Sequence, residues 1–378
     1  MRTSKTELAD ILAGHKDFLM SKRNLCTVQR KAIGDIASCR TSALGGHTEQ
    51  CGQCGYKRIS YNSCRNRNCP KCQQSKQIVW VDKLKSSIVP VKHFQLVFTI
   101  PDILRPLFYI NQSLCYTMLF KASAEALKKA MKHYHQAEGG AIAILHTWGQ
   151  ALNYHPHIHM IVPAGGIDVD GVQWVHTEGK FLVPIKAISK MFRGVLIHMI
   201  DKEWSKGNLI VPDRFEPNFD ILKKDLYRKG WVVFAEKPIK GPGQLINYLG
   251  KYINRVAISN HRIKEWCQGK VTFSYTNNRI HTRNCKMTIN DVDFINRFLW
   301  HVLPKGFYKI RYYGIYAHMN CDKREQCFEL LEESPFIPSF EAIPLSEVIK
   351  RTTGIDHSYC PACKQGRMLR IGQCNMTL

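Results

Sequence analysis

The spacing of apolar residues along the chain alternates between a helical and a strand-like period, which predicts a mixed fold. Residues 111–136 and 185–206 carry apolar side chains three and four positions apart, as amphipathic helices do. Residues 93–100, 141–149 and 151–162 are apolar runs bounded by proline and glycine, which predicts strands. We expect the last two strands to pair antiparallel. The pattern therefore predicts an α+β fold with helices packed on an antiparallel sheet.

Weaker patterns occupy the rest of the chain. Residues 1–38 have broken helical spacing and many basic side chains, which fits either a helical arm on the DNA backbone or a helix packed on a neighbouring module. Further regular elements are expected as strands at 231–234 and 271–275 and as a helix at 291–302. The remaining segments are expected to be connectors, namely basic ones at 76–92 and 213–230 and a mobile acidic one from Cys321 onward.

Three histidines alternate in the strand expected at 151–162, in the segment His155-Pro156-His157-Ile158-His159. Successive side chains of a strand point to opposite faces, so the three imidazoles share one face. Two imidazoles held in this way make half of a divalent-metal site. A surface run is the alternative, and it is a better explanation of one histidine than of three. His146, in the preceding strand, is expected only to pack.

A helix is expected at 243–256, because Leu245, Leu249, Ile253 and Val256 fall on one stripe. Four-residue spacing places three polar side chains on the neighbouring stripe, Gln244, Tyr248 and Tyr252, and three on another, Asn247, Lys251 and Arg255. The helix would thus present two phenols beside two cations. An activated tyrosine can form a covalent intermediate, and a metal beside the scissile phosphate would polarise it. The alternative is ordinary helix packing with solvated hydroxyls and cations.

Two C-x-x-C pairs near the N-terminus predict a structural zinc site. Fourteen residues separate the pair Cys51 and Cys54 from the pair Cys69 and Cys72, and together the pairs supply four thiolates for a tetrahedral ion. Other ligand-type residues leave a second site, or an interleaved grouping, open: Cys39, His47, Cys64, Cys360 and Cys363. Arg65 and Arg67, beside the second pair, suit phosphate contact.

Composition narrows the class of partner. The chain of 378 residues carries 54 Lys+Arg against 30 Asp+Glu, so its net charge is +24, which favours a polyanionic partner. No window approaches the ~20 apolar residues that a spanning helix needs, and the N-terminus lacks an apolar signal core. We therefore expect a cytoplasmic location, where the 15 cysteines bind metal rather than form disulfides.

A histidine-hydrophobic-histidine strand followed by a Tyr-x-x-x-Tyr helix resembles the HUH nucleases. Within them, the chain is similar to the two-tyrosine rolling-circle transposases of bacterial insertion sequences. The resemblance extends along nearly the whole chain, through Cys64-Arg65-Asn66-Arg67-Asn68-Cys69-Pro70-Lys71-Cys72, Phe94-Gln95-Leu96-Val97-Phe98-Thr99-Ile100-Pro101, His301-Val302-Leu303-Pro304-Lys305-Gly306-Phe307 and Arg311-Tyr312-Tyr313-Gly314. The order and spacing of these segments carry the likeness.

The resemblance implies a catalytic Mg²⁺ or Mn²⁺ on His157 and His159, with Gln244 or His155 as the third ligand. It implies that Tyr248 or Tyr252 attacks a phosphodiester of single-stranded DNA and leaves a free 3′-hydroxyl and a 5′-phosphotyrosine. Transposon ends and target DNA would be the substrates. The sequence contains no helicase motif, so host factors or supercoiling would separate the strands. The protein would be bacterial and nucleoid-associated.

We expect three regions: a helical arm with a zinc-binding module at 1–90, a nuclease domain at 91–300, and a C-terminal segment at 301–378. Lys251, Arg255 and Arg311 join the two arginines beside the zinc site as expected DNA contacts. Two other functions fit part of the pattern. A plasmid replication initiator or relaxase would share the nuclease core, and a zinc-dependent DNA-binding protein without catalysis would share the cysteines and charge.

Overall fold

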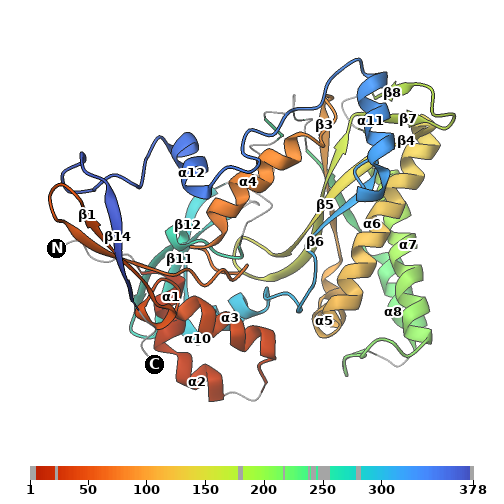
Figure 1. Ribbon diagram of the computed structural model, residues 1–378. Coiled ribbons are helices and arrows are strands. Elements are labelled where there is room, and N and C mark those ends of the chain that lie inside the picture. The colour runs from red at the N-terminus through yellow and green to blue at the C-terminus, as the bar shows by residue number, and fades with distance from the viewer. Residues whose placement is uncertain are drawn as a thin grey trace.

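The computed structural model describes residues 6–21, 24–177, 182–215, 218–236, 239, 244–245, 256–277 and 282–374, with the backbone alone for 73–77. Within these ranges the fold is α+β with antiparallel sheets, as the sequence predicts (Figure 1). No helix in the described part of the chain is both long and apolar enough to cross a membrane.

A five-stranded antiparallel sheet forms the centre of the structure. Its strands lie in the order β13 (Ile310–Gly314), β5 (Gly140–Trp148), β6 (Tyr154–Pro163), β3 (His93–Thr99) and β9 (Val232–Ala235). The histidine strand, β6, pairs antiparallel with β5 on one side and with β3 on the other. The predictions of β3, β5, β6 and β9, and of the antiparallel β5–β6 pair, are confirmed.

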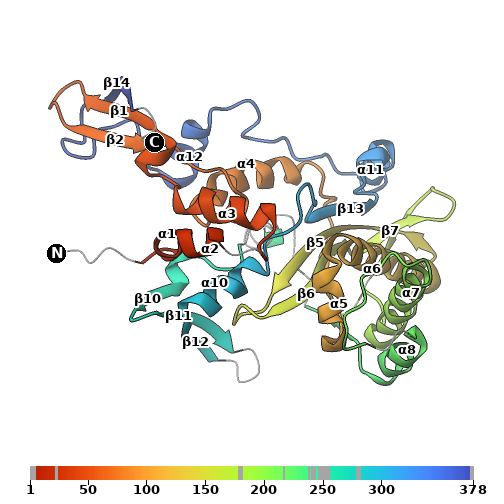
Figure 2. The same cartoon turned by 90° about the horizontal axis from the view of Figure 1, so that it is seen from below.

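One face of the sheet is covered by helices (Figure 2). Alternate residues of β3, Phe94, Leu96 and Phe98, point to this face and are almost fully buried. They share one apolar core with four helices, α5 (Arg105–Ile110), α6 (Gln112–His135), α7 (Ile185–Ser205) and α8 (Phe219–Arg228). The long predicted helices, α6 and α7, are confirmed, and their apolar stripes are the surfaces that they bury.

The opposite face carries a smaller apolar core and, further along the same strands, the histidines. Ile142, Ile144 and Ile161 form this core with side chains of α4 (Gln73–Lys85) and α11 (Cys321–Leu330). The loop strands β4 (Ala137–Glu138), β7 (Gly165–Asp168) and β8 (Trp174–His176) make a separate three-stranded sheet nearby. On this face, β5 and β6 are covered by an apolar core along part of their length and carry the histidines further along.

The N-terminal helices pack on a second sheet rather than standing apart as an arm. Three helices, α1 (Leu8–Gly14), α2 (Lys16–Ser21) and α3 (Thr27–Ala37), share an apolar core with β10 (Ile263–Cys267), β11 (Lys270–Asn277), β12 (Thr282–Asn290) and α10 (Asp291–Leu299). Figure 2 shows these helices beside that sheet. Leu8, Ile11 and Ile33 are fully buried there. The structure thus supports the packing alternative for these helices, whereas their contact with DNA stays a prediction.

The two ends of the chain meet in a third sheet. Strand β1 (Gly46–Cys51) pairs with β2 (Lys57–Tyr61) on one side and with β14 (Met368–Cys374) on the other. β14 follows a short helix, α12 (Leu345–Thr353). Strands β13 and β14 both come from the segment after residue 300, yet each belongs to a sheet begun earlier in the chain. The packing units therefore cross the region boundaries expected from the sequence.

Three segments expected to be connectors contain helices: α4 covers most of the basic segment at 76–92, α8 lies within 213–230, and α11 begins at Cys321. In α8, Phe219, Leu222 and Leu226 are buried, and the Asn218 side chain accepts a hydrogen bond from the Asp220 amide and caps the helix. In α11, Cys327 and Phe328 are buried on the histidine side of the central sheet. Both helices are short and strongly charged, so only a few apolar positions reveal them in the sequence.

Candidate metal centres and active site

Three imidazoles converge on one face of the central sheet. His157 and His159 project from β6, and His146 projects from β5 directly opposite His157 in the antiparallel register. One ring nitrogen of each lies within 4.8 Å of the others. His146 and His159 are only 3% and 8% exposed. The sequence pattern predicts His157 and His159 as ligands, whereas His146 comes from the neighbouring strand.

The geometry of the pair on β6 fits ligands of one ion. The Nε2 atoms of His157 and His159 lie 3.0 Å apart. Two nitrogens bound to one ion at about 2.1 Å each would be separated by about 3 Å. His157 Nδ1 lies 2.6 Å from the backbone oxygen of His155, so Nδ1 carries the proton and Nε2 presents a lone pair. Burial lowers the pKa of His157 to about 4, so the ring is neutral and able to bind metal near pH 7.

His155 does not belong to this cluster. The Arg105 guanidinium donates to its Nδ1 over 3.2 Å at the start of β6. Burial, together with that guanidinium, lowers the pKa of His155 to about 4. Of the two third ligands expected from the sequence, His155 lies outside the cluster, and among the histidines the structure brings His146 to the pair instead. The sequence predicts that 141–149 pairs antiparallel with 151–162, and the structure adds the register that sets His146 opposite His157.

The predicted tyrosine helix lies mostly outside the described residues, which include neither Tyr248 and Tyr252 nor Lys251 and Arg255. Gln244 and Leu245, at its expected start, are described. Leu245 is fully buried in the core that contains Ile142, Ile144 and Ile161, on the histidine face of the sheet. Gln244 is exposed, and its role as a metal ligand stays a prediction.

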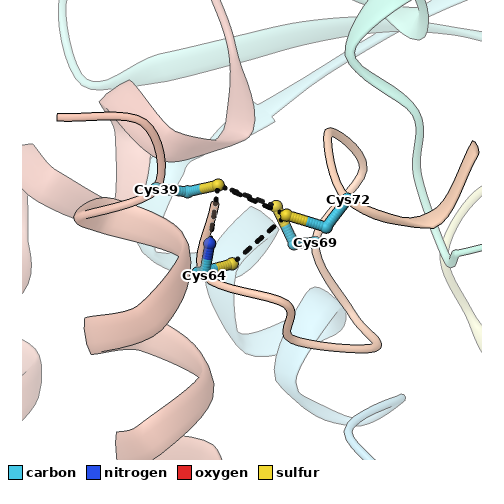
Figure 3. A group of neighbouring side chains, drawn as sticks. All are labelled: Cys39, Cys64, Cys69 and Cys72. Carbon is cyan, nitrogen blue, oxygen red and sulfur yellow. Dashed lines mark hydrogen bonds between the residues drawn. The ribbon is translucent and has the colours of Figure 1, made fainter. Parts of the chain in front are cut away.

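Four cysteines from the N-terminal module form one compact cluster (Figure 3). Cys39, Cys64, Cys69 and Cys72 point their sulfurs at one another, with Sγ–Sγ distances of 3.5 Å between Cys39 and Cys72 and 3.6 Å between Cys64 and Cys72. Zinc bonds of about 2.3 Å would hold tetrahedral sulfurs about 3.7 Å apart, whereas a disulfide bond is about 2.05 Å long. The four thiols are free, and their spacing fits zinc.

A second four-cysteine cluster joins the two ends of the chain. Cys51 and Cys54 leave the end of β1, while Cys360 and Cys363 precede β14, its antiparallel partner. The Cys51 and Cys363 sulfurs lie 3.7 Å apart, and those of Cys54 and Cys360 lie 3.6 Å apart. Backbone amides of Gly366 and Gln365 lower the pKa of Cys363 to about 6, which favours the thiolate that a metal binds.

These clusters replace the grouping expected from the sequence. Cys51 and Cys54 share no cluster with Cys69 and Cys72, because pairing of β1 with β14 brings the C-terminal cysteines to the first pair. His47 also lies outside both clusters, with its Nε2 3.3 Å from a Glu49 carboxylate oxygen. The two C-x-x-C pairs lie close together in the sequence, but this closeness does not predict which cysteines meet. The pairing of β1 with β14 determines the grouping instead.

Two of the arginines expected to bind DNA make contacts within the protein. The Arg67 guanidinium donates to three backbone oxygens, those of Leu303, Pro304 and Phe307, at 2.7–3.0 Å. Arg311 lies 4.5 Å from the ring centre of Phe120 and 5.2 Å from that of Phe307, and it donates to Thr117 Oγ1. Both side chains therefore take part in the packing of the fold, and their contact with DNA stays a prediction. Arg65 is exposed, and its contact with DNA stays a prediction.

Comparison with known families defines the class of protein. Residues 140–324, which include β5, the histidine strand and β13, match the family described as "Putative transposase". Residues 11–100 match the family described as "Transposase zinc-binding domain", which covers the first cysteine cluster and half of the second. The central sheet, the histidines and six of the eight clustered cysteines thus fall within matches to a transposase and to its zinc-binding domain.

Two relatives agree with that class over most of their length. The protein named "Putative transposase y4qJ" of Sinorhizobium fredii is 38% identical over 98% of this chain and 96% of its own. The "Transposase for insertion sequence element IS801" of Pseudomonas savastanoi pv. phaseolicola is 27% identical over 80% of this chain and 74% of its own. The chain therefore belongs to this family of insertion-sequence transposases. Transposases act on DNA, and the zinc-binding match together with the cysteine clusters supports structural Zn²⁺.

Proposed function

We propose that this transposase nicks and rejoins single-stranded DNA through 5′-phosphotyrosine intermediates, in rolling-circle transposition. The observation that carries the proposal is the convergence of His146, His157 and His159 on one face of the sheet. Three imidazoles at this spacing fit one divalent cation. A sheet with a purely structural role does not need three histidines whose ring nitrogens meet. A metal site in a protein that acts on DNA explains why they are there.

The ligand set bears on the choice of cation. Mg²⁺ prefers oxygen ligands, whereas imidazole suits transition metals. With three imidazoles as ligands, Mn²⁺ is the better candidate of the two ions expected from the sequence. When bound, the ion would polarise the scissile phosphate and stabilise the leaving oxygen. His157 and His159 would hold the ion in a fixed position, because they lie on a strand that is paired on both sides.

The nucleophile would be Tyr248 or Tyr252. Support comes from Leu245, three residues before the first tyrosine, because it is buried on the histidine face of the sheet. The phenol oxygen would form a bond to phosphorus as the bond from phosphorus to the 3′ oxygen breaks. The phenol proton is lost and the 3′ oxygen gains one, so the products are a 3′-hydroxyl and a 5′-phosphotyrosine. Rejoining reverses these changes with a new 3′-hydroxyl, without a nucleotide cofactor.

Cleavage of a labelled single strand tests the metal centre. The strand carries the terminus of the insertion sequence and is incubated with zinc-loaded protein, with and without Mn²⁺. We expect cleavage only with the added ion, and products whose 3′ ends a polymerase can extend. His157→Ala and His159→Ala should lower the rate by at least about tenfold. Cleavage that needs no divalent ion and survives both changes would exclude the proposed centre.

A failure to cleave has a defined meaning as well. Protein that retains zinc and binds DNA but cleaves no strand with any divalent cation would be a zinc-dependent DNA-binding protein. Cleavage at a plasmid origin, with none at a transposon end, would instead indicate a replication initiator or relaxase. The match to insertion-sequence transposases favours the transposon end as substrate.

A further inference from the structure

A buried glutamine on the strand next to the histidines contacts one of them. Gln95 lies on β3, which pairs antiparallel with the histidine strand and places Gln95 opposite Ile161. Its side chain points to the same face as the histidines, since the flanking Phe94 and Leu96 belong to the opposite core. Gln95 is completely buried. A buried amide needs polar partners to offset its loss of water.

The partner of Gln95 is His159. The amide nitrogen, Nε2, lies 2.8 Å from His159 Nδ1. The amide oxygen, Oε1, is buried and has no hydrogen-bond partner among the described residues. Because Nε2 can only donate, this arrangement requires His159 Nδ1 to accept and its Nε2 to carry the proton. The His159 Nε2–H would then donate to the lone pair of His157 Nε2, 3.0 Å away.

That arrangement suits a site without a cation, because a protonated Nε2 cannot be a ligand. Binding requires the proton of His159 to move to Nδ1, where it needs an acceptor. Turning the Gln95 amide about its terminal bond brings Oε1, the orphaned oxygen, to that position. A glutamine side chain can therefore serve either tautomer, and His157 already has its acceptor in the backbone oxygen of His155.

We propose that Gln95 is a positioning residue that accepts the Nδ1 proton of His159 and so directs Nε2 toward the cation. This inference rests on the proposed function, because it assumes that the histidine cluster binds a divalent ion. It adds a residue from a third strand, β3, to a site otherwise built from β5 and β6. Gln95 does not touch the cation or the DNA, so its effect should appear in metal affinity.

The test is Mn²⁺ affinity of the full-length, zinc-loaded protein, measured from the loss of the free-ion electron paramagnetic resonance signal. Gln95→Leu preserves approximate size but removes the acceptor, and it should weaken binding about 10- to 100-fold. Gln95→Glu keeps an acceptor and should restore affinity to at least the wild-type value. Leu96→Met changes the neighbouring residue, on the opposite face, and should leave affinity unchanged. His159→Ala gives the level without the site.

The outcomes separate the two proposals. If the wild-type protein binds Mn²⁺ and Gln95→Leu binds it with the same affinity, the role of Gln95 is overturned while the metal centre remains. Equal losses in Gln95→Leu and Gln95→Glu would also overturn it, because the acceptor would then not be what matters. Wild-type binding no tighter than that of His159→Ala would contradict the metal centre itself. Thermal unfolding of each variant shows whether a loss of affinity is merely a loss of fold.

Discussion

At the scale of single residues, the proposed metal centre would depend on an imidazole supplied by a second strand. His157 and His159 lie two residues apart on one strand and would approach a cation from one direction. His146 approaches from β5 and is held there by the backbone pairing of His146 with His157. Its ring is stacked 4.7 Å from that of Trp148, which limits its rotation. Two strands thus fix three ring nitrogens without support from a loop.

The first prediction separates His146 from His155. His146→Ala should reduce Mn²⁺-dependent cleavage and Mn²⁺ affinity at least about tenfold, because it removes a ligand. His155→Ala should leave Mn²⁺ affinity within about threefold of wild type, since that ring contacts Arg105 rather than the cluster. Mn²⁺ binding and strand cleavage are measured on both variants. If His155→Ala lost the metal and His146→Ala retained it, the assignment of the third histidine would be wrong.

Arg67 and Arg65 give a second prediction with a built-in control. Arg67→Ala should destabilise the protein by about 2–3 kcal/mol, because it leaves up to three carbonyls without their donor. Arg65→Ala changes an exposed side chain nearby and should leave the unfolding midpoint unchanged, while weakening DNA binding most at low salt. Urea unfolding and DNA titrations on both variants check this. Loss of DNA affinity in Arg67→Ala without loss of stability would contradict the structural role.

At the scale of elements, two buried histidines outside the histidine cluster form hydrogen bonds where a strand begins and where a helix ends. His93, at the start of β3, contacts the Tyr316 hydroxyl at 2.7 Å and the Val91 oxygen at 2.9 Å. His301, just after α10, contacts Thr147 Oγ1 and the Leu152 oxygen. Burial lowers the pKa of each to about 4. Both rings are therefore held neutral in the folded protein.

Acid should consequently weaken the fold. The unfolded chain takes up a proton at each of these histidines near pH 6.5, whereas the folded protein does so only near pH 4. The free energy of unfolding should therefore fall as the pH decreases from 6.5 toward 4. Denaturant unfolding at several pH values, with zinc content followed in parallel, measures the slope. His301→Gln should be less stable at pH 7.5 but lose less on acidification, and an unchanged slope would contradict this account.

Elements of strong periodicity were predictable from the sequence, and those stabilised mainly by distant contacts were not. The β5–β6 pair and helices α6 and α7 have long uninterrupted apolar patterns. Helices α8 and α11 expose most of their residues, so their few buried positions resemble those of a connector. His146 carries no motif of its own and gains its meaning only from its partner strand. The cysteine pairs likewise show that ligands are present, while the β1–β14 pairing decides which of them meet.

At the scale of the whole molecule, the two ends of the chain are joined close to the zinc-binding module. The second cysteine cluster takes two residues from each end, and β14 extends the sheet begun by β1 (Figure 1). The first cluster contributes Cys39, Cys69 and Cys72 to the core shared with β11 and α10. Each cluster thus connects segments that are far apart in the sequence, and loss of zinc should loosen both connections.

Zinc stoichiometry tests this arrangement. We expect two zinc ions per chain in the purified protein, one for each cluster. Cys360→Ser should leave one ion, and it should make the segment after residue 330 more sensitive to limited proteolysis. Cys115→Ser, a buried cysteine of α6 outside both clusters, should retain two. Elemental analysis of the three proteins decides the matter. Two ions retained in Cys360→Ser would contradict the second site.

The most direct test of the proposed chemistry is covalent trapping of DNA on the protein. Full-length protein, Mn²⁺ and an end-labelled single strand carrying the transposon terminus are mixed and separated on a denaturing gel. We predict a protein–DNA band that survives denaturation, requires the ion, and is lost in His157→Ala and in the Tyr248→Phe, Tyr252→Phe double variant. Persistence of the band in the double variant, or its absence from wild type that still binds Mn²⁺ and the same strand, would contradict a phosphotyrosine intermediate.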